Sequence, residues 1–501
     1  MLAMLYTSTR GKTEKVCSAH AITRGLADDG GLFVPQKLTT LTLSEIIAMS
    51  DMPYAERAAK ILSLFLTDYT MDELQQCTHA VYCGDKFQDN TAPLKQVNDK
   101  TGVLELWHGP TSAFKDVALQ LLPHLLLKAL EKTGEQHNIV ILVATSGDTG
   151  KAALEGFAGV KGTRVIVFYP DEGVSEIQKR QMITQVGDNV SVIAVKGNFD
   201  DAQSGVKEIL ADRELVEKLE EKGFSFSSAN SINWGRLIPQ VVYYFSAYAD
   251  AVKAGCINPG DEINFSVPTG NFGDILAGYY AKCMGLPVHK LICASNTNNV
   301  LSVFLNTGKY DRRRDFYKTI SPSMDILISS NLERLLYQIT DEDAAKVAAW
   351  MKELRDEGFY DVGSKLLGKI QKAFFGTWVD EFETKETICK VFRDKNYLLD
   401  PHTAVAWRAC EKYRLVSSDE RYCVVLSTAS PFKFYGSVLE AIKPELYRQE
   451  MDPFEALELL AGLSSTTIPQ QLRELKEAPV RHKLKIEKQA MKDSVAKTLK
   501  I

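Results

Sequence analysis

The chain has 501 residues, 45% of them hydrophobic, which is enough for a large core and about three domain-sized units. Its 59 lysines and arginines and 64 acidic residues are interspersed, with a net charge of −5, which argues against nucleic acid or an anionic membrane as a partner. The nine cysteines form no Cys-x-x-Cys pair, which argues against a zinc ribbon or a disulfide framework. Because no run of about eighteen apolar residues could span a bilayer and the N-terminus becomes polar too early for a signal peptide, we expect a cytoplasmic protein.

The first 92 residues differ in pattern from the rest. They are mixed and mostly helical in pattern, with a glycine-rich turn, DDGGLFVP, at residues 28–35. We expect residues 1–92 to form an N-terminal module.

A lysine stands at the start of the next predicted helix. In the run WHGPTSAFKD at residues 107–116 the Gly-Pro-Thr sequence predicts a turn, and residues 117–130 carry a broad apolar face typical of a buried helix. Lys115 therefore lies where the helix dipole and unpaired amides disfavour a cation, unless the amine is kept neutral, as a Schiff base would keep it. The alternative is an ordinary lysine whose stem follows the helix and whose amine is solvated.

Short β-branched runs then alternate with helical patterns. The runs at residues 139–144, 165–169 and 190–195 predict buried strands, with helices at residues 151–157 and 176–186. Strands separated by single helices imply right-handed crossovers and a parallel sheet covered on both faces.

Two polar runs lie near these strands. The sequence TSGDTG at residues 145–150 has more donors than a helix cap needs, which favours an anionic ligand, although Asp148 could serve only as a cap. The sequence SSANSINWGR at residues 227–236 precedes an apolar stretch at residues 237–248. Its Arg236 could bind a phosphate or carboxylate through two hydrogen bonds, although arginines more often form surface salt bridges.

The alternation resumes in the second half. Residues 263–267, 289–294 and 422–427 predict further strands, and residues 275–284 predict a helix. The sequence PTGNFGD at residues 268–274 lies between a strand and a helix, where backbone amides bind phosphate. It has neither Gly-x-Gly-x-x-Gly nor a Walker-type ending, so it favours a small phosphate group over a dinucleotide or a nucleoside triphosphate. The alternative is a tight turn without a ligand.

The remaining segments complete the chain. Residues 305–395 are helix-like and charge-rich, which predicts an insertion between sheet elements, and the basic tail beyond residue 476 predicts a solvated terminal helix. The run LSTASPFKF at residues 426–434 places hydroxyl groups beyond a strand end, where ligands of open sheets bind, unless they only cap a helix. In DPHTA at residues 400–404, His402 fits a structural role better than a catalytic one.

Taken together, these motifs resemble the threonine synthase family, whose members are pyridoxal-phosphate enzymes of the tryptophan-synthase-β-like fold. STRG at residues 8–11 and DGGLF at residues 29–33 resemble the N-terminal domain of that family. The resemblance implies an α/β fold with two open parallel-sheet subdomains. It divides the chain into an N-terminal domain (1–92), a catalytic domain (93–440, with a helical insertion at about 305–395) and a C-terminal helical tail (441–501).

The resemblance also implies a reaction and a set of residues. Lys115 would form the Schiff base with pyridoxal 5'-phosphate, and the reaction would convert O-phospho-L-homoserine and water to L-threonine and phosphate. The residues implied at the cofactor are Lys115, Gly270, Asn271, Phe272, Asp274 and Thr428. The residues implied at the substrate are Ser146, Thr149, Asn230, Asn233 and Arg236. The expected assembly is a monomer or a homodimer.

Two other functions stay open at this point. A threonine-synthase-like phospholyase or a hydroxyamino-acid dehydratase would share the same frame, and Ser430 and Phe432 stand where related synthases often have His and Ala. A binding protein that kept the fold and lost catalysis is the alternative of another class. The presence of Lys115 with the glycine loop argues against that last alternative, because a pure binder needs no Schiff-base lysine.

Overall fold

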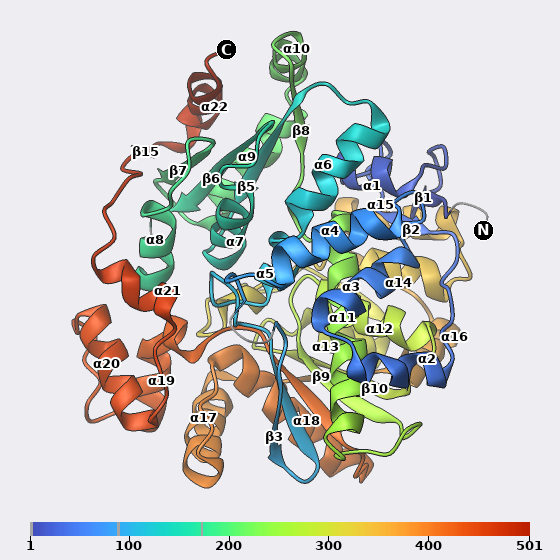
Figure 1. Ribbon diagram of the computed structural model, residues 1–501, viewed down its shortest axis with the longest axis vertical. Helices are drawn as coiled ribbons and strands as arrows, with labels where there is room; N and C mark the ends of the chain where they lie inside the picture. The colour runs from blue at the N-terminus through green and yellow to red at the C-terminus, as the bar shows by residue number, and fades with distance from the viewer. Residues whose placement is uncertain (1–3, 88–90, 172–173) are drawn as a thin grey trace.

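The computed structural model of the protein describes residues 4–87, 91–171 and 174–501. Residues 1–3 and 88–90 of the expected N-terminal module therefore lie outside the described part of the chain. Two open sheets dominate the fold, one of six strands and one of five, with helices packed against them (Figure 1). The predicted α/β class with two parallel-sheet subdomains is confirmed.

The larger sheet is parallel except at one edge, where β3 and β4 run antiparallel. In spatial order its strands are β13 (Phe374–Trp378), β10 (Val288–Ser295), β9 (Ile263–Pro268), β14 (Cys423–Ser427), β4 (Thr101–Glu105) and β3 (Leu94–Asn98). Every residue of β9 and β14 is buried, because helices cover both faces of the sheet. The predicted strands at 263–267, 289–294 and 422–427 are confirmed as β9, β10 and β14.

The smaller sheet is parallel throughout. In spatial order its strands are β15 (Lys485–Ile486), β7 (Val190–Val195), β6 (Thr163–Pro170), β5 (Asn138–Ala144) and β8 (Phe224–Ser227). The predicted strands at 139–144, 165–169 and 190–195 are confirmed as β5, β6 and β7. Their helices are α7 (Asp148–Phe157), α8 (Glu176–Ile183), α9 (Phe199–Ala211) and α10 (Arg213–Glu221).

The helix predicted at residues 117–130 is in fact two helices, α5 (Lys115–Leu119) and α6 (Leu122–Thr133). Pro123 causes the break, because it cannot donate a hydrogen bond to Leu119 O and its ring would clash with that carbonyl. The Leu119 carbonyl, which lacks that helical hydrogen bond, faces α7. Gly156 of α7 lies so close to it that a Cβ on residue 156 would be 2.1 Å from Leu119 O. None of the helices among the described residues is long and apolar enough to cross a bilayer.

The longest helix, α11 (Trp234–Lys253), contains the predicted apolar stretch at residues 237–248 and is buried along nearly its whole length. It packs against α12 (Gly273–Cys283), which begins directly after the glycine loop. Further helices associated with the larger sheet are α13 (Val300–Thr307), α16 (Ser364–Ala373), α17 (Glu381–Lys395) and α18 (Pro401–Ser417).

The N-terminal module is mostly helical, as predicted, and lies against α11. Its elements are β1 (Tyr6–Ser8), α1 (Ser18–Arg24), β2 (Phe33–Pro35), α2 (Leu43–Ile47), a 3-10 turn (Ala48–Asp51), α3 (Tyr54–Ser63) and α4 (Met71–Tyr82). The glycine-rich turn is held by Asp29, which accepts hydrogen bonds from Ser8 Oγ (2.6 Å) and Gly31 N (2.9 Å). The turn leads directly into β2, which pairs with β1.

The expected helical insertion at 305–395 is only partly helical. It contributes β13 to the edge of the larger sheet, and β11 (Lys309–Asp311) pairs with β12 (Phe359–Asp361). The strand β13 is a short aromatic run, FFGTW, and such β-prone residues are easily hidden among charged helices. The helices α14 (Leu332–Ile339) and α15 (Ala344–Asp356) complete the segment, with a 3-10 turn (Pro322–Met324).

The prediction of a solvated terminal helix beyond residue 476 is wrong. The strand β15 extends the smaller sheet beside β7 (Figure 1). In α22 (Met491–Leu499), the side chains of Met491, Val495 and Leu499 are buried in a cluster that includes residues of α9. The spacing of four residues puts these three side chains on one helical face. The preceding helices of the C-terminal segment are α19 (Tyr435–Ile442), α20 (Pro453–Ser464) and α21 (Gln470–Arg473).

Candidate active site

The loops that follow β5, β9 and β14 meet the segment that precedes α5. Phe114 N donates to Thr428 O (2.9 Å) and Ser430 N donates to Ser112 O (3.1 Å), so the loop after β14 is fixed beside Lys115. In open α/β sheets, ligands bind beyond the carboxyl ends of the strands. The candidate site lies at this meeting point of the two sheets.

Lys115 is the first residue of α5, and its side chain is 11% exposed. Its amine lies 3.6 Å from Oδ2 of Asp148 and 4.7 Å from the centre of the Phe114 ring. Burial lowers the pKa of the Lys115 amine; Asp148 raises it, and the cations of Lys433 and Arg236 lower it further. The lowered pKa favours the neutral amine, which is the form that attacks an aldehyde.

A second buried lysine, Lys433, was not predicted. It lies in the 3-10 turn Pro431–Phe434, with its amine 2.6 Å from Oδ1 of Asp148 and 2.9 Å from Thr111 O, to which it donates. Burial alone would raise the pKa of Asp148, but Lys433 and then Lys115 hold that pKa well below its usual range. Asp148 therefore stays ionised and links the two lysines. In the sequence, Lys433 lies in the polar run at residues 426–434, but only the hydroxyl groups of that run are predicted to matter.

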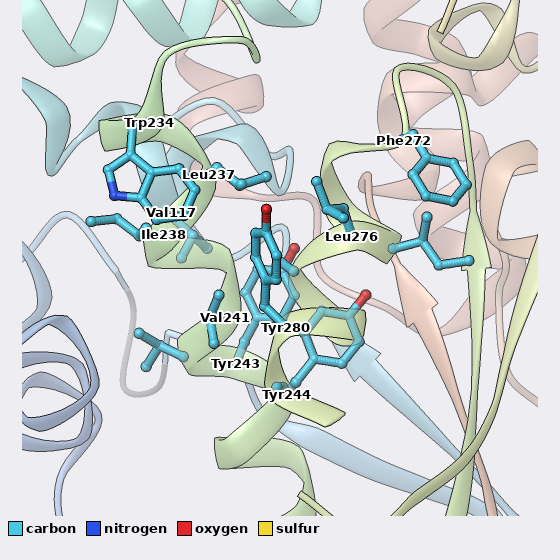
Figure 2. Close-up of a cluster of buried hydrophobic side chains, with 14 of the residues drawn as sticks. Val117, Trp234, Leu237, Ile238, Val241, Tyr243, Tyr244, Phe272, Leu276 and Tyr280 are labelled. Atoms are coloured by element: carbon cyan, nitrogen blue, oxygen red, sulfur yellow. The ribbon is translucent and has the colours of Figure 1, made fainter. Parts of the chain in front are cut away.

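The loop after β9 is shaped by close backbone contacts. A Cβ on Gly270 would lie 2.6 Å from Ser323 O, so glycine is required there, and Asn271 is exposed. Phe272 has a left-handed backbone (φ 62°), and its ring is buried against Phe374. Figure 2 shows that the Phe272 side chain belongs to the core. What the loop offers a ligand is backbone N–H groups at the start of α12, an arrangement that binds phosphate.

Asp274, in the first turn of α12, faces α11. Its Oδ1 accepts hydrogen bonds from Tyr243 OH (2.6 Å) and Tyr244 OH (2.9 Å), while Oδ2 is buried without a partner. Figure 2 shows both tyrosines in the buried cluster between α11 and α12. Burial raises the pKa of Asp274 to about 6, against the opposing effect of these hydrogen bonds. A carboxylate repels a phosphate, so this side chain is suited to holding α12 on α11.

Arg236, in the first turn of α11, is a buried cation without an acidic partner among the residues that the structure describes. Its side chain donates to Ala229 O (2.9 Å), and its Nε is unsatisfied. Burial lowers the pKa of Arg236 to about 10. An unpaired buried guanidinium is costly, and a bound anion would offset that cost. The nearby Asn230 is half-buried, and its side-chain amide has no partner within the described parts of the chain.

Asn233 has a different environment. Its Nδ2 donates to Ile22 O (3.0 Å) and Ser228 O (2.8 Å), and its Oδ1 accepts from Gly235 N (2.9 Å). It therefore caps α11 and ties that helix to the N-terminal module. With both donors engaged, it has none left for a substrate phosphate, unlike the sequence expectation.

The other predicted hydroxyl groups lie in the loop after β5, at the start of α7 and in the loop after β14. Ser146 and Thr149 flank Asp148 and are half-buried, whereas Thr428 is buried where its backbone meets Phe114. The turn at residues 145–150 is organised by Thr145, whose Oγ1 accepts from Gly147 N (3.0 Å) and Gly150 N (2.9 Å). The hydroxyl groups of Ser146 and Thr149 are thus not needed for the turn itself.

His402 supports the glycine loop indirectly, through a hydrogen bond to Ser323. Its Nε2 accepts from Ser323 N (3.2 Å), so Nδ1 carries the proton and donates to Oδ1 of Asp400 (2.8 Å). Ser323 is the residue whose carbonyl faces Gly270. The structural role expected for His402 agrees with this geometry.

Pyridoxal phosphate fits this set of groups. Lys115 supplies an amine with a lowered pKa for an aldehyde, and the loop from Gly270 supplies backbone N–H donors for a phosphate. Thr428, whose carbonyl accepts from the backbone of Phe114, supplies a hydroxyl group. Arg236 supplies a further unpaired cation.

Comparison with known proteins agrees with this assignment. Residues 5–82 match the model of the threonine synthase N terminus, residues 93–363 match pyridoxal-phosphate dependent enzymes, and residues 403–495 match the threonine synthase C-terminal model. The threonine synthase of Pseudomonas aeruginosa is 42% identical, over 87% of this chain and 90% of that protein. Human threonine synthase-like 1 is 40% identical over 85% of this chain, which spans only 58% of that longer protein.

Solved structures give the same result. Threonine synthase from Brucella melitensis, determined with pyridoxal phosphate bound, superposes with a TM-score of 0.87 at 37% identity and full coverage of both chains. Threonine synthase from yeast superposes with a TM-score of 0.88 at 35% identity, over 99% of each chain. The fold and the site are those of a pyridoxal-phosphate-dependent lyase. The chain belongs to the threonine synthase family.

Proposed function

We propose that the protein converts O-phospho-L-homoserine and water to L-threonine and phosphate. The observation that carries the proposal is that the site contains two unusual cationic side chains. The Lys115 amine has a lowered pKa, and Arg236 is a buried guanidinium without an acidic partner among the described residues. The first suits covalent capture of the cofactor aldehyde, and the second suits a phosphate group. Membership of the threonine synthase family supports the same reaction.

Lys115 has two roles in this proposal. Its amine would hold the cofactor aldehyde covalently, and the free amine would move protons at the substrate carbons. The cofactor, when bound, supplies an electron sink for charge that develops on the substrate. Asp148, kept ionised by Lys433, stabilises the Lys115 ammonium each time the amine takes a proton.

The other residues divide between cofactor and substrate. We assign the backbone of Gly270, Asn271 and Phe272 to the cofactor phosphate and the hydroxyl group of Thr428 to the pyridine nitrogen. A hydroxyl group there does not hold the ring protonated as a carboxylate would, so other groups must tune the electron sink.

We assign Arg236 and Asn230 to the substrate phosphate. Arg236 has an unsatisfied Nε, and Asn230 has a side-chain amide free of described partners. Ser146 and Thr149, which flank Asp148, are assigned to the remaining polar groups of the substrate.

A trapping experiment tests the role of Lys115. Borohydride reduction of the yellow holoenzyme should fix the cofactor on the peptide that contains Lys115. The structure offers two matched controls, the buried lysines Lys433 and Lys151, which should carry no label. A label on either control, or a colourless protein that takes up no pyridoxal phosphate, would refute the assignment.

Product analysis separates the synthase from its closest rival. The 40% identity to a protein named threonine synthase-like 1 is almost as high as the 42% identity to a threonine synthase, so similarity alone is a weak discriminator. With O-phospho-L-homoserine, threonine and phosphate should appear in equal amounts. Formation of 2-oxobutyrate and ammonia in place of threonine would assign a phospholyase instead.

We also propose how the chain is organised and where it works. The functional units are residues 1–92, 93–440 and 441–501, and the active form is a monomer or a homodimer that binds no nucleic acid. A cytoplasmic, reducing compartment is supported by the nine cysteines, all of which are free thiols.

A further inference from the structure

Residues 329–334, which we call the strap, connect the two loops assigned to phosphate groups. Ser329 Oγ donates to Gly270 O (2.8 Å), and Asn331 N donates to Asn271 O (3.1 Å). The side chain of Asn331 turns the other way and donates to Ser231 O (3.2 Å). One short segment thus holds the backbone of the glycine loop and that of the loop at residues 230–233.

Arg334 lies at the end of the strap and is fully buried. Its three donor nitrogens reach three different segments: Nε donates to Phe33 O (3.0 Å), one terminal nitrogen to Asn331 Oδ1 and the other to Ile232 O (2.6 Å). The guanidinium also lies 5.6 Å from the ring of Trp234, the first residue of α11. A single side chain therefore links the N-terminal module, the strap and the loop at residues 230–233.

The strap is anchored to the N-terminal module a second time. Oε1 of Glu333 accepts from Thr9 Oγ1 (2.6 Å) and from Arg10 Nε (3.0 Å), and Oε2 accepts from another Arg10 nitrogen (3.0 Å). Thr9 Oγ1 in turn accepts from Leu32 N (2.8 Å), in the glycine-rich turn that leads into β2. Glu333 is buried, and a paired, bidentate carboxylate in that position holds its partners in a fixed geometry.

We propose that Arg334 is a positioning residue that fixes the cofactor loop and the substrate-phosphate loop relative to each other, with the N-terminal module as its anchor. The proposal rests on the assignment of residues 270–272 and 230–236 to the two phosphate groups. It makes the N-terminal module a part of the active-site architecture, through the contacts of Phe33, Thr9 and Arg10 with the strap. A lysine cannot replace Arg334, because three carbonyl acceptors in three directions require the planar guanidinium fork.

The test compares Arg334→Lys with Arg57→Lys in the full chain. Arg57 is a buried arginine of α3 that donates to Met49 O (2.8 Å) and Met52 O (2.9 Å) and pairs with Asp250 of α11 (2.8 Å). It joins the same module to α11 but contacts neither phosphate loop. Arg334→Lys should raise both the dissociation constant for pyridoxal phosphate and the KM for the phosphorylated substrate about tenfold or more, with kcat changed less than about threefold. Arg57→Lys should lower the Tm while leaving both constants within about twofold.

Amide hydrogen exchange of the apoprotein provides a readout without substrate or cofactor. Arg334→Lys should speed exchange at residues 230–233 and 270–273, and Arg57→Lys should not. Glu333→Gln, which keeps the shape of the side chain, should act in the same direction with a smaller effect, and it keeps the test decisive if Arg334→Lys fails to fold.

Three results would overturn the proposal: unchanged cofactor affinity and unchanged exchange in Arg334→Lys, equal effects in Arg57→Lys, or faster exchange spread evenly over the chain. Cofactor affinity and exchange are measured without turnover. An enzyme that binds pyridoxal phosphate but makes no threonine would therefore refute the proposed reaction. The role of Arg334 would still be decided by the cofactor affinity and the hydrogen exchange of its variants.

Discussion

Replacement of Lys433 by methionine tests the buried charge network most directly. The Lys433 side chain is 0% exposed, and its amine lies 2.6 Å from Asp148, whose side chain is 3% exposed. Methionine keeps most of the apolar stem and removes the charge. Asp148 then retains Lys115 at 3.6 Å and the amide of Gln178 at 2.8 Å. Thr111 O loses one of its two donors and keeps Gln181 Nε2 at 3.2 Å.

The expected loss follows from these distances. Two unit charges 2.6 Å apart attract by about 6 kcal/mol at an effective dielectric constant of about 20, before the cost of removing both from water. Loss of one partner of a buried pair typically costs about 3–5 kcal/mol, and the remaining contacts of Asp148 place this case near about 3 kcal/mol.

The pH dependence has a definite sign. The folded pKa of Asp148 lies below its unfolded value of about 3.9, so the stability gained from the pair is complete above that pH and declines as the pH falls. The difference between the wild type and Lys433→Met should be constant from about pH 5 to pH 8 and shrink below about pH 4. Because Lys433 also lowers the pKa of Lys115, the variant should capture pyridoxal phosphate with a pH profile shifted to higher pH.

Urea unfolding of the apoprotein, followed by tryptophan fluorescence, measures the change in the free energy of unfolding. Lys218→Met is the control, because Lys218 forms a solvent-exposed pair with Glu214 at 2.8 Å on one helix face and its loss should leave the free energy of unfolding nearly unchanged. The reasoning is refuted if Lys433→Met costs no more than this control, or if its profile of cofactor capture against pH does not move.

Three other substitutions probe the remaining polar groups. Arg236→Met should lower kcat/KM for O-phosphohomoserine about 100-fold, measured by steady-state kinetics. The apoprotein should become more stable by about 1 kcal/mol, measured by urea unfolding. A stability loss of several kcal/mol would mean that Arg236 is structural. Asp274→Asn removes a carboxyl group whose pKa of about 6 exceeds its unfolded value. Ionisation of that group costs the wild type about 3 kcal/mol of stability as the pH rises from about 4 through about 6, so the stability of the variant relative to the wild type should rise by that amount. A pH-independent difference between the two proteins would contradict this prediction. Asn233→Ala should cost about 1–2 kcal/mol of stability through the lost cap and leave KM within about twofold, whereas a large rise in KM at unchanged stability would restore its substrate role.

An uninterrupted apolar run decides which strands can be predicted from the sequence; β4 is buried throughout but reads TGVLE, and no strand is predicted there. The strands β5, β6, β7, β9, β10 and β14 are covered on both faces, so each is a short uninterrupted apolar run that stands out in the sequence. The unpredicted strands lack that signature. The sequence LKQVN of β3 is polar and exposed at an edge, FSFS of β8 has four residues, and KI of β15 has two. Pairing with a neighbour makes them strands, and pairing is not visible locally.

The active site divides in a similar way. Lys115 and Gly270 could be predicted because a turn beside a helix start is a local pattern, and so could the unusual density of polar groups around Asp148. Lys433 and Arg334 could not, since their importance depends on partners far away in the chain. The polar runs also mix two kinds of residue. Asn233 uses its amide to cap a helix, whereas Arg236, three residues later, has an unsatisfied donor. This difference depends on the folded structure and not on the local sequence.

Among the cations buried at the junction of the two sheets, Arg236 has no acidic partner in the part of the chain that the structure describes. Lys115, Lys433 and Arg236 each bring a positive charge, and among the described residues Asp148 is the one carboxylate that forms an ion pair with any of them. Buried cations without partners cost stability, so an arrangement of this kind persists where a ligand provides the missing negative charge. The proposed reaction provides two phosphate groups, one on the cofactor and one on the substrate, and releases the second as product. Two phosphate groups in one buried site repel each other. On the proposed assignment, the strap links the two loops that hold these groups and so keeps the groups at a fixed separation.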